Sequence, residues 1–239
     1  MARNKAAALA QGEYLVMLDS DDILLPCALS TYDQVIQAFD GPPLIIGAMA
    51  DFQDGQSVTA VSRAALPVKV LKYRDYLSKD VRLPLSSSRI VVRKSVFDEV
   101  GGLRNTTAAT FHLDSLNFIL KVATQQPCVV VQQPYTVAYR HHAANAIRSL
   151  DPITEGILEL VRTERRGQYP GGSERRQERY ACIGSVALSW AIGHCWRAGR
   201  WRLGLQLLRE TMPMGWAAIA KKIKARFRRP TQAIVVAQR

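Results

Sequence analysis

Three carboxylates stand where an apolar segment ends. Residues 12–26 read GEYLVMLDSDDILLP, so Asp19, Asp21 and Asp22 follow a run that is typical of a buried strand. Carboxylates this close repel one another unless a cation or hydrogen-bond donors compensate. Oxygen ligands favour a hard divalent cation, Mg²⁺ or Mn²⁺, which keeps open positions for substrate phosphates. A second interpretation stays open, an Asx-rich turn in which Asp22 caps the next helix.

The elements around these residues alternate between helix and strand. Apolar spacing and breaks at glycine and proline predict helices at 2–11, 27–39 and 111–125, strands at 14–18 and 43–50, and one or two strands at 128–140. Residues 87–103 are typical of a strand and a short helix that stops at Gly101 and Gly102. The predicted buried helix faces comprise Leu29, Val35, Ile36 and Phe39, and Phe111, Leu113, Leu116 and Leu120. This alternation predicts an α/β fold in which ligands bind beyond the carboxyl ends of the strands, where the aspartates lie.

Four segments, in this order, resemble the family 2 glycosyltransferases. They are ARNKAAALAQGEYLVMLDSDDILLP (2–26), RKSVFDEVGGL (93–103), FHLDSLNFILKV (111–122) and VAYRHHAANAIRS (137–149). The resemblance covers about residues 2–150 and includes the Asp-x-Asp motif. It implies a GT-A fold with a mixed sheet. It also implies transfer of a sugar from a nucleotide-diphosphate donor to a glycan or lipid-linked hydroxyl, usually with inversion at the anomeric carbon.

The resemblance implies roles for individual residues. Asp21, Asp22 and His142 match the positions that hold the metal near the diphosphate, and Asp19 matches a second-shell or ribose contact. A metal there would neutralise the charge that grows on the leaving diphosphate. The remaining implied neighbours of the donor are Arg3, Asn4, Arg140 and His141.

The catalytic helix departs from the family pattern. Family members usually carry two acids there, and the second takes the proton from the acceptor hydroxyl. Asp114 matches the first acid and Ser115 the second, and serine cannot act as that base unaided. We expect Asp114 to substitute as the base, or the site to be impaired. The plain alternative is that Asp114 is a solvated or N-capping acid.

A second departure concerns the start of the resemblance, at the helix that carries Arg3. Family members normally begin with an apolar strand, a nucleotide-binding loop and further elements. We therefore expect this chain to lack the first βαβ elements, as a fragment or as a remnant. Poor donor binding by residues 1–239 alone is the expected consequence, unless a partner supplies the other half.

Charge divides the sequence unevenly. Residues 1–161 carry a net charge of −1 and residues 162–239 carry +13. This split predicts a partial GT-A domain at 1–164, a Gly/Pro/Ser-rich linker at 165–176, and a helical hairpin with a basic amphipathic tail at 177–239.

The tail combines aromatic, aliphatic and basic residues. Its hairpin, predicted to turn at Ala198 and Gly199, resembles the helical hairpin that follows the catalytic domain in many bacterial family members. The helix that follows is predicted to place Trp216, Ile219, Ile223 and Phe227 among Lys221, Lys222, Lys224, Arg226, Arg228 and Arg229. Such a helix suits an anionic membrane surface. A helix packed on its own domain is the alternative, and the absence of a nucleic-acid-binding motif argues against nucleic acid.

The cellular compartment follows from what the sequence lacks. Its four cysteines have no metal-binding spacing, and its first residues lack the apolar core of a signal peptide. The longest uncharged run, 180–196, contains His194 and suits a buried helix better than a membrane span. We expect a cytoplasmic protein, peripheral on the inner face of the plasma membrane.

Three functions compete at this point. The first is a metal-dependent inverting glycosyltransferase of cell-surface polysaccharide synthesis. The second is an inactive remnant that binds a partner. The third is a basic surface-binding module without transferase chemistry, which would leave Asp19–Asp22 without a metal role.

Overall fold

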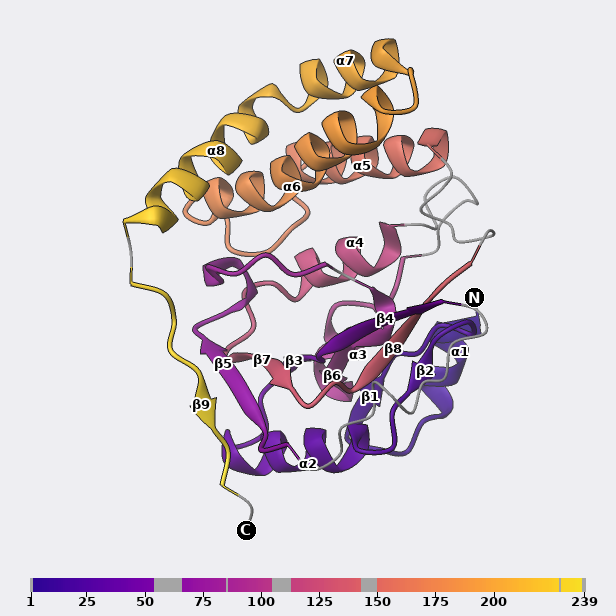
Figure 1. The fold of residues 1–239 in the computed structure, drawn as a ribbon, viewed down its shortest axis with the longest axis vertical. Coiled ribbons are helices and arrows are strands. Elements are labelled where there is room, and N and C mark those ends of the chain that lie inside the picture. Colours follow the sequence, from indigo (N-terminus) through magenta and orange to yellow (C-terminus); the bar gives the residue numbers. More distant parts are fainter. Residues whose placement is uncertain are drawn as a thin grey trace. The chain divides into compact units, whose positions relative to one another are not determined.

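The computed structural model describes residues 2–53, 66–84, 86–104, 113–142, 150–227 and 229–237. The chain forms two compact units (Figure 1). The first comprises residues 1–103, 125–145 and 231–239, and the second comprises residues 104–124 and 146–230. We describe each by itself.

A six-stranded mixed sheet forms the centre of the first unit. Its order is β1 (Tyr14–Val16), β6 (Ile90–Arg93), β3 (Leu44–Ile46), β7 (Cys128–Gln133), β5 (Lys69–Tyr73) and β9 (Ile234–Val235). The β3–β7 pair is parallel and the other neighbours are antiparallel. Consequently β1, β3 and β7 all run in the same direction.

A second, three-stranded sheet begins where these three strands end. It has the order β2 (Ile23–Leu24), β8 (Val137–His141) and β4 (Met49–Gln53). Each of its strands continues a strand of the first sheet: β2 follows β1, β4 follows β3, and β8 follows β7. The chain therefore leaves the large sheet three times at the same edge, and Asp19–Asp22 form one of these three exits.

Gly47 shows why one predicted strand is really two. The single strand predicted at 43–50 is interrupted between β3 and β4. A Cβ atom on Gly47 would lie 2.5 Å from the hydroxyl oxygen of Tyr32 and 2.6 Å from that of Thr136. Only glycine fits where the chain crosses between the sheets.

The helices of this unit are α1 (Ala2–Leu9), α2 (Ala28–Ala38) and α3 (Lys94–Glu99), with 3₁₀ turns at Tyr76–Ser78 and Ser87–Arg89. Two predictions for α2 are wrong. Leu29 is 61% exposed, because the buried face runs through Ala28, Thr31, Tyr32 and Val35 instead. The N-cap residue is Cys27, so Asp22 does not cap this helix.

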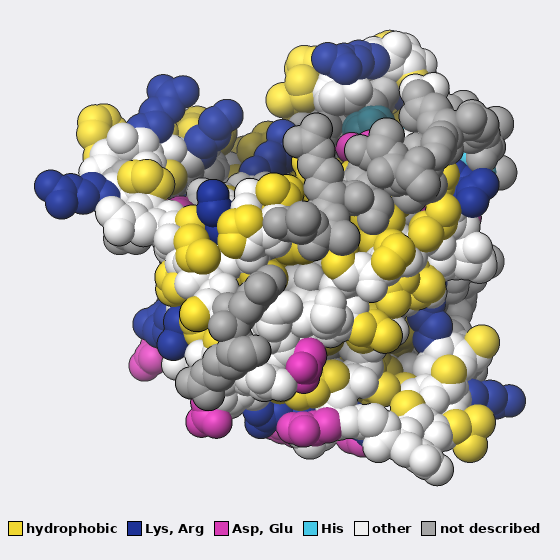
Figure 2. Space-filling view, turned by 60° about the horizontal axis from the view of Figure 1, so that its bottom comes forward, with side chains coloured by type: hydrophobic (Ala, Val, Ile, Leu, Met, Phe, Trp, Pro, Cys, Tyr) yellow, Lys and Arg dark blue, Asp and Glu magenta, His cyan; other side chains and the backbone are white. Residues whose placement is uncertain are grey.

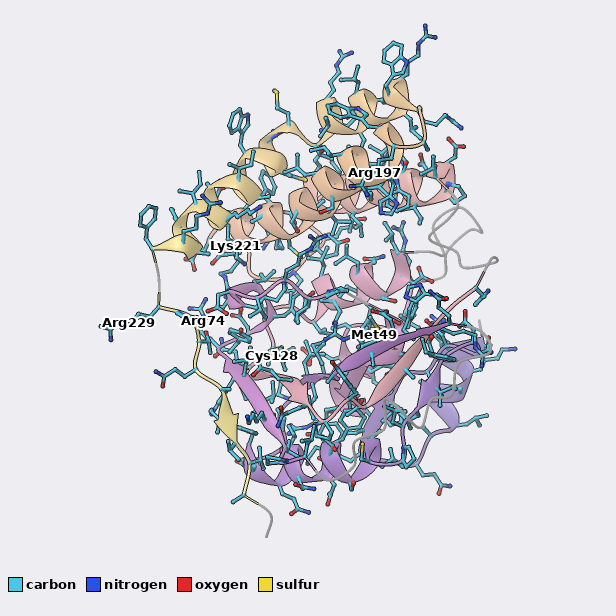
Figure 3. All side chains as sticks on the ribbon, in the orientation of Figure 1. Met49, Arg74, Cys128, Arg197, Lys221 and Arg229 are labelled. Atoms are coloured by element: carbon cyan, nitrogen blue, oxygen red, sulfur yellow. The ribbon has the colours of Figure 1, made fainter. Side chains whose placement is uncertain are left out.

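The core of the first unit lies between α2 and the large sheet. It joins Val35 to Ile45, Val91 and Val129, one from each of three neighbouring strands, and all four are fully buried. Cys128 also lies among the buried side chains (Figure 3). This close-packed layer fixes the ends of β1, β3 and β7 relative to one another.

The second unit is helical. It contains α4 (Asp114–Lys121), α5 (Leu150–Arg165), α6 (Arg176–Trp190) with a π-helical continuation (Ala191–Trp196), α7 (Trp201–Glu210) and α8 (Met212–Arg226). Gly199, with φ of +69°, makes the turn before α7, in the left-handed region that favours glycine. Helix α4 begins at Asp114, while Phe111, which the sequence assigned to its buried face, lies outside the described residues.

The segment predicted as a linker, 165–176, connects α5 to α6 within this unit. Most of its residues are exposed, and Tyr169 is buried. Arg179 forms a two-pronged ion pair with Glu164, at 2.6 and 2.9 Å, and also donates to the carbonyl oxygens of Pro170 and Gly172. Tyr169 donates a hydrogen bond to Asn117 of α4. Composition alone could not show that this Gly/Pro-rich segment wraps around a buried arginine.

The long uncharged run at 180–196 forms the buried part of α6 and its continuation, with Ile183, Ala187 and Ala191 fully buried. His194 stacks on Trp190 within this segment. Over the described part of the chain, no helix combines the length and apolar character needed to cross a bilayer.

The buried ion pair gives a stability prediction. Glu164→Gln should lower the free energy of unfolding by about 3 kcal/mol, because it leaves the buried Arg179 guanidinium without its counter-charge. The side chains of Glu164 and Arg179 are 1% and 3% exposed. Urea denaturation measures the change.

Glu210→Gln is the matched control. Glu210 pairs with Arg165 at 3.5 Å where both side chains are about half exposed, so its loss should cost under about 1 kcal/mol. Equal shifts of the urea midpoint in the two variants would show that the buried Glu164–Arg179 pair contributes no more to stability than the exposed Arg165–Glu210 pair.

Candidate active site

The side chain of Asp22 holds the segment that follows β1 in place. It accepts a 2.6 Å hydrogen bond from the Ser88 hydroxyl through Oδ2 and a 3.1 Å bond from the Arg140 backbone N–H through Oδ1. The residue is 8% exposed. Ser88 precedes β6 and Arg140 lies in β8, so one carboxylate joins three separate segments of the first unit.

Asp19 is held by the same serine and by a cation. Its backbone N–H donates to Ser88 Oγ at 3.0 Å, and its Oδ1 accepts from Arg3 Nη2 at 2.5 Å. Arg3 also donates to Ser87 Oγ at 3.4 Å. Residues Asp19–Asp22 are called the carboxylate loop below. The ion pair connects helix α1 to this loop and brings two of the predicted site residues, Arg3 and Asp19, into contact.

Asp21 has a different environment from its neighbours. Its Oδ2 lies 2.9 Å from Nε2 of His142, and the Asp21 and His142 side chains are 41% and 22% exposed. The structure thus brings together two residues 121 positions apart that the sequence assigned to one metal site. Of the three predicted ligands, Asp21 and His142 point to a shared, solvent-reachable place, while both oxygens of Asp22 face protein donors.

Arg140 and His141 complete the rim. Arg140 Nε donates to the backbone carbonyl oxygen of Asp21 at 3.0 Å, and the guanidinium lies 5.1 Å above the Phe52 ring. His141 Nε2 lies 3.0 Å from Oδ1 of Asp51 on the neighbouring strand β4. Of these contacts, only the hydrogen bond from Arg140 reaches the backbone that carries Asp21.

The side chain of Asn4 binds the backbone of Leu103 in this structure. Its amide donates to the carbonyl oxygen of Leu103 at 2.8 Å and accepts from the Leu103 N–H at 3.0 Å. Both polar ends of the side chain are therefore engaged with the segment after α3. A direct contact of Asn4 with a donor stays a prediction.

Burial sets the electrostatics of the loop. It raises the pKa of Asp19 above its ordinary value, and the nearby Arg3 guanidinium opposes that rise. Burial likewise raises the pKa of Asp22, against the opposing hydrogen bonds from Ser88 and Arg140. Removal of a negative charge from water causes both shifts, and the donors around each carboxylate compensate in part.

Asp21 and His142 form a hydrogen-bonded pair in this structure, and the same two atoms are of the kinds that bind divalent cations. An octahedral ion with bonds of about 2.1 Å places neighbouring ligand atoms about 3.0 Å apart, close to the 2.9 Å between Asp21 Oδ2 and His142 Nε2. Within the described ranges, no three His, Cys, Asp or Glu side chains gather into a metal-binding group. The protein would thus supply two ligands and leave positions for water and phosphate, as Mg²⁺ sites commonly do. The imidazole nitrogen favours Mn²⁺ over Mg²⁺ at the same place.

Asp114 lies in the second unit, as the first residue of α4, and is 5% exposed. Leu116 and Leu120 of the predicted apolar face are buried, and Leu113 packs against the cluster of α5 and α6. Ser115, which replaces the second acid of the resembled motif, is half-buried. The role of Asp114 as a base stays a prediction.

Sequence reasoning missed Ser87 and Ser88. The only local signal is the serine run 86–88 before an apolar strand. Because β6 pairs antiparallel with β1, residues just before β6 must lie beside residues just after β1. That pairing cannot be inferred from the serines themselves.

Comparison with known proteins supports a transferase fold. No protein-family model matches the sequence. An uncharacterised glycosyltransferase of Haemophilus influenzae is 23% identical over 165 residues, which are 67% of this chain and 53% of that protein. The chain thus spans about half the length of this relative.

Among solved structures, residues 1–349 of the S. aureus glycosyltransferase TarS, in complex with UDP-GlcNAc, align with a TM-score of 0.57. The identity is 13%, over 93% of this chain and 68% of that one. At this identity the likeness concerns the fold. The mixed α/β chain is similar in structure to a glycosyltransferase and related in part to another.

The Asp22–Ser88 bond gives a second stability prediction. Ser88→Ala and Asp22→Asn should each lower the free energy of unfolding by about 1.5–3 kcal/mol, the range for hydrogen bonds to charged groups. The double variant should lose less than the sum, by about 1 kcal/mol, because both changes break the same bond. Urea denaturation of the four proteins measures this coupling.

Ser30→Ala is the matched control, since Ser30 Oγ makes an exposed bond to the Cys27 carbonyl oxygen. Its effect should stay within about 0.5 kcal/mol. If the losses of unfolding free energy in Ser88→Ala and Asp22→Asn simply add in the double variant, the bond between the two side chains does not fix the loop.

Proposed function

We propose that this chain transfers a sugar from a nucleoside-diphosphate donor to a hydroxyl of a glycan or lipid-linked acceptor, as a family 2 glycosyltransferase of GT-A fold. The observation that carries the proposal is the Asp21–His142 pair, 2.9 Å apart at the end of β1, in a chain of transferase fold. UDP-GlcNAc bound to TarS supports a nucleotide sugar as the donor class.

Asp21 and His142 would hold Mn²⁺ or Mg²⁺, which supplies the positive charge that a diphosphate leaving group needs. The chain's own residues then keep this pair in place. Asp22 fixes the loop through Ser88 and Arg140, and Arg140 holds the Asp21 backbone. Arg3, paired with Asp19, adds a cation beside the same loop.

Asp114 is our candidate for the base that takes the proton of the attacking hydroxyl, in an inverting displacement. A positioned base contributes roughly 10²–10⁴-fold to such a step. We place the activity in cell-surface polysaccharide synthesis at the inner face of the plasma membrane. The alternative, an inactive remnant, draws on Ser115 at the position where the resembled motif has its second acid.

Metal-dependent nucleotide binding tests the site. Titration calorimetry of the full chain with UDP should show binding, even if weak, that requires Mn²⁺ and disappears with EDTA. Asp21→Asn and His142→Ala should each weaken it at least about tenfold, since each removes one of two protein ligands.

Asp51→Asn provides the control. Asp51 lies 3.0 Å from His141 in a pair of the same kind on strands β4 and β8, so this variant should bind as wild type does. If Asp21→Asn binds as tightly as Asp51→Asn, or if Mn²⁺ has no effect on any of UDP, GDP or CDP, the proposed site is wrong.

The base makes a separate prediction. Asp114→Asn should lower the rate of donor hydrolysis or transfer by roughly 10²–10⁴-fold while leaving Mn²⁺-dependent UDP affinity within about twofold, because a base acts on the acceptor. Ser115→Ala should change neither quantity much. If wild type and Asp114→Asn both hydrolyse or transfer the donor only at the background rate but still bind UDP, the alternative of an inactive, binding remnant is favoured.

A further inference from the structure

Helix α8 has a fixed inner side. Met214 and Gly215 are buried against α6, where a Cβ atom on Gly184 would lie only 2.0 Å from the Met214 carbonyl oxygen. Leu188 of α6 packs on Gly215. The two backbones approach so closely that α8 cannot rotate on α6 without a clash.

The opposite side of α8 is apolar and exposed. Trp216, Ile219, Ile223 and Phe227 are 68%, 40%, 52% and 85% exposed. At about 100° per residue, Ile223 and Phe227 lie within about 20° of Trp216 around the helix axis, and Ile219 within about 60°. Met214, on the buried side, lies about 160° away from Trp216. We call these four residues the outer strip.

Cations flank the outer strip on both sides. By the same geometry, Lys224 lies about 80° to one side of Trp216, and Arg226 and Lys222 lie about 80° and 120° to the other. Helix α8 contains no acidic residue. Figure 3 shows Lys221 on this helix and Arg229 beyond its end, and the surface at the left of Figure 2 combines hydrophobic with basic side chains.

The outer strip belongs to a wider concentration of exposed apolar side chains. Of the sixteen large hydrophobic residues that are exposed in the described chain, nine lie between Ile192 and Phe227. They include three of the four tryptophans, Trp196, Trp201 and Trp216. Tryptophan favours the boundary between water and lipid.

Three kinds of partner fit an exposed apolar strip: a second protein chain, a nucleic acid or a bilayer. Protein interfaces are depleted in lysine, which here flanks the strip on both sides. Nucleic acid would explain the cations but leave Ile219 and Ile223 in water. Only an anionic bilayer takes the apolar strip into its interface while its headgroups meet the flanking cations.

We propose that α8 docks on an anionic lipid bilayer through the outer strip, with Lys222, Lys224 and Arg226 at the headgroups. Helix α8 does pack on its own unit through Met214 and Gly215, as the alternative in the sequence analysis had it, and the outer strip remains exposed for docking. No residue of the carboxylate loop takes part, so docking is measured without metal or nucleotide, and its failure would leave the proposed transferase site untouched.

The experiment is sedimentation of the full chain with vesicles. Binding to vesicles with 30% phosphatidylserine should exceed binding to pure phosphatidylcholine at least about tenfold, and 0.5 M NaCl should reduce it. Lys222→Gln/Lys224→Gln should weaken binding about 25-fold, from about fivefold per cation near such a surface. Trp216→Ser/Ile223→Ser should weaken it at least tenfold with no change in charge.

Leu9→Ser/Leu29→Ser is the matched control, because these leucines are 82% and 61% exposed but lie on α1 and α2. This control should bind as wild type does, and circular dichroism should show unchanged helix content in every variant. Equal binding to neutral and anionic vesicles, or none to either, would overturn the proposal. So would a dimer in analytical ultracentrifugation that the Trp216→Ser/Ile223→Ser variant abolishes without any lipid binding, which would assign the strip to a second copy.

Discussion

The Asp22 carboxylate is the constraint on which the candidate site depends. It is buried, and burial of a charge is costly unless hydrogen bonds compensate. The Ser88 hydroxyl and the Arg140 N–H provide those bonds, and each comes from a different segment of the chain. The loop therefore has one arrangement in which Asp22 is satisfied, and that arrangement turns the adjacent Asp21 toward His142.

The two neighbouring aspartates illustrate how environment divides roles between identical side chains. Asp22 is buried and holds the loop, whereas Asp21 is partly exposed and pairs with His142. Arg140 links the two, because its N–H binds the Asp22 side chain and its guanidinium binds the Asp21 carbonyl oxygen. The metal and phosphate site that we propose would need such an external support, since its own ligands would not hold the loop without the metal.

The sequence predicted much of this arrangement, for identifiable reasons. Short apolar runs before polar residues located β1, β6 and β7, and the position of Asp19–Asp22 beyond a strand followed from the α/β alternation. The pairing of strands could not be predicted, because it depends on contacts between distant segments. For that reason the sequence did not reveal the role of Ser88, the break at Gly47, or the hydrogen bonds from Arg179 to the Pro170 and Gly172 carbonyl oxygens within the predicted linker.

Helix α8 shows a different balance of forces. Full burial of a Trp, Ile or Phe side chain contributes about 1.5–3 kcal/mol, and the residues of the outer strip, 40–85% exposed, forgo much of it. The helix is held instead by the close approach of Gly184 and Gly215, which needs no apolar side chain on the outer side. Packing thus leaves the outer side of α8 unconstrained. A strip of large apolar residues between flanking cations at that side is what a bilayer interface would stabilise.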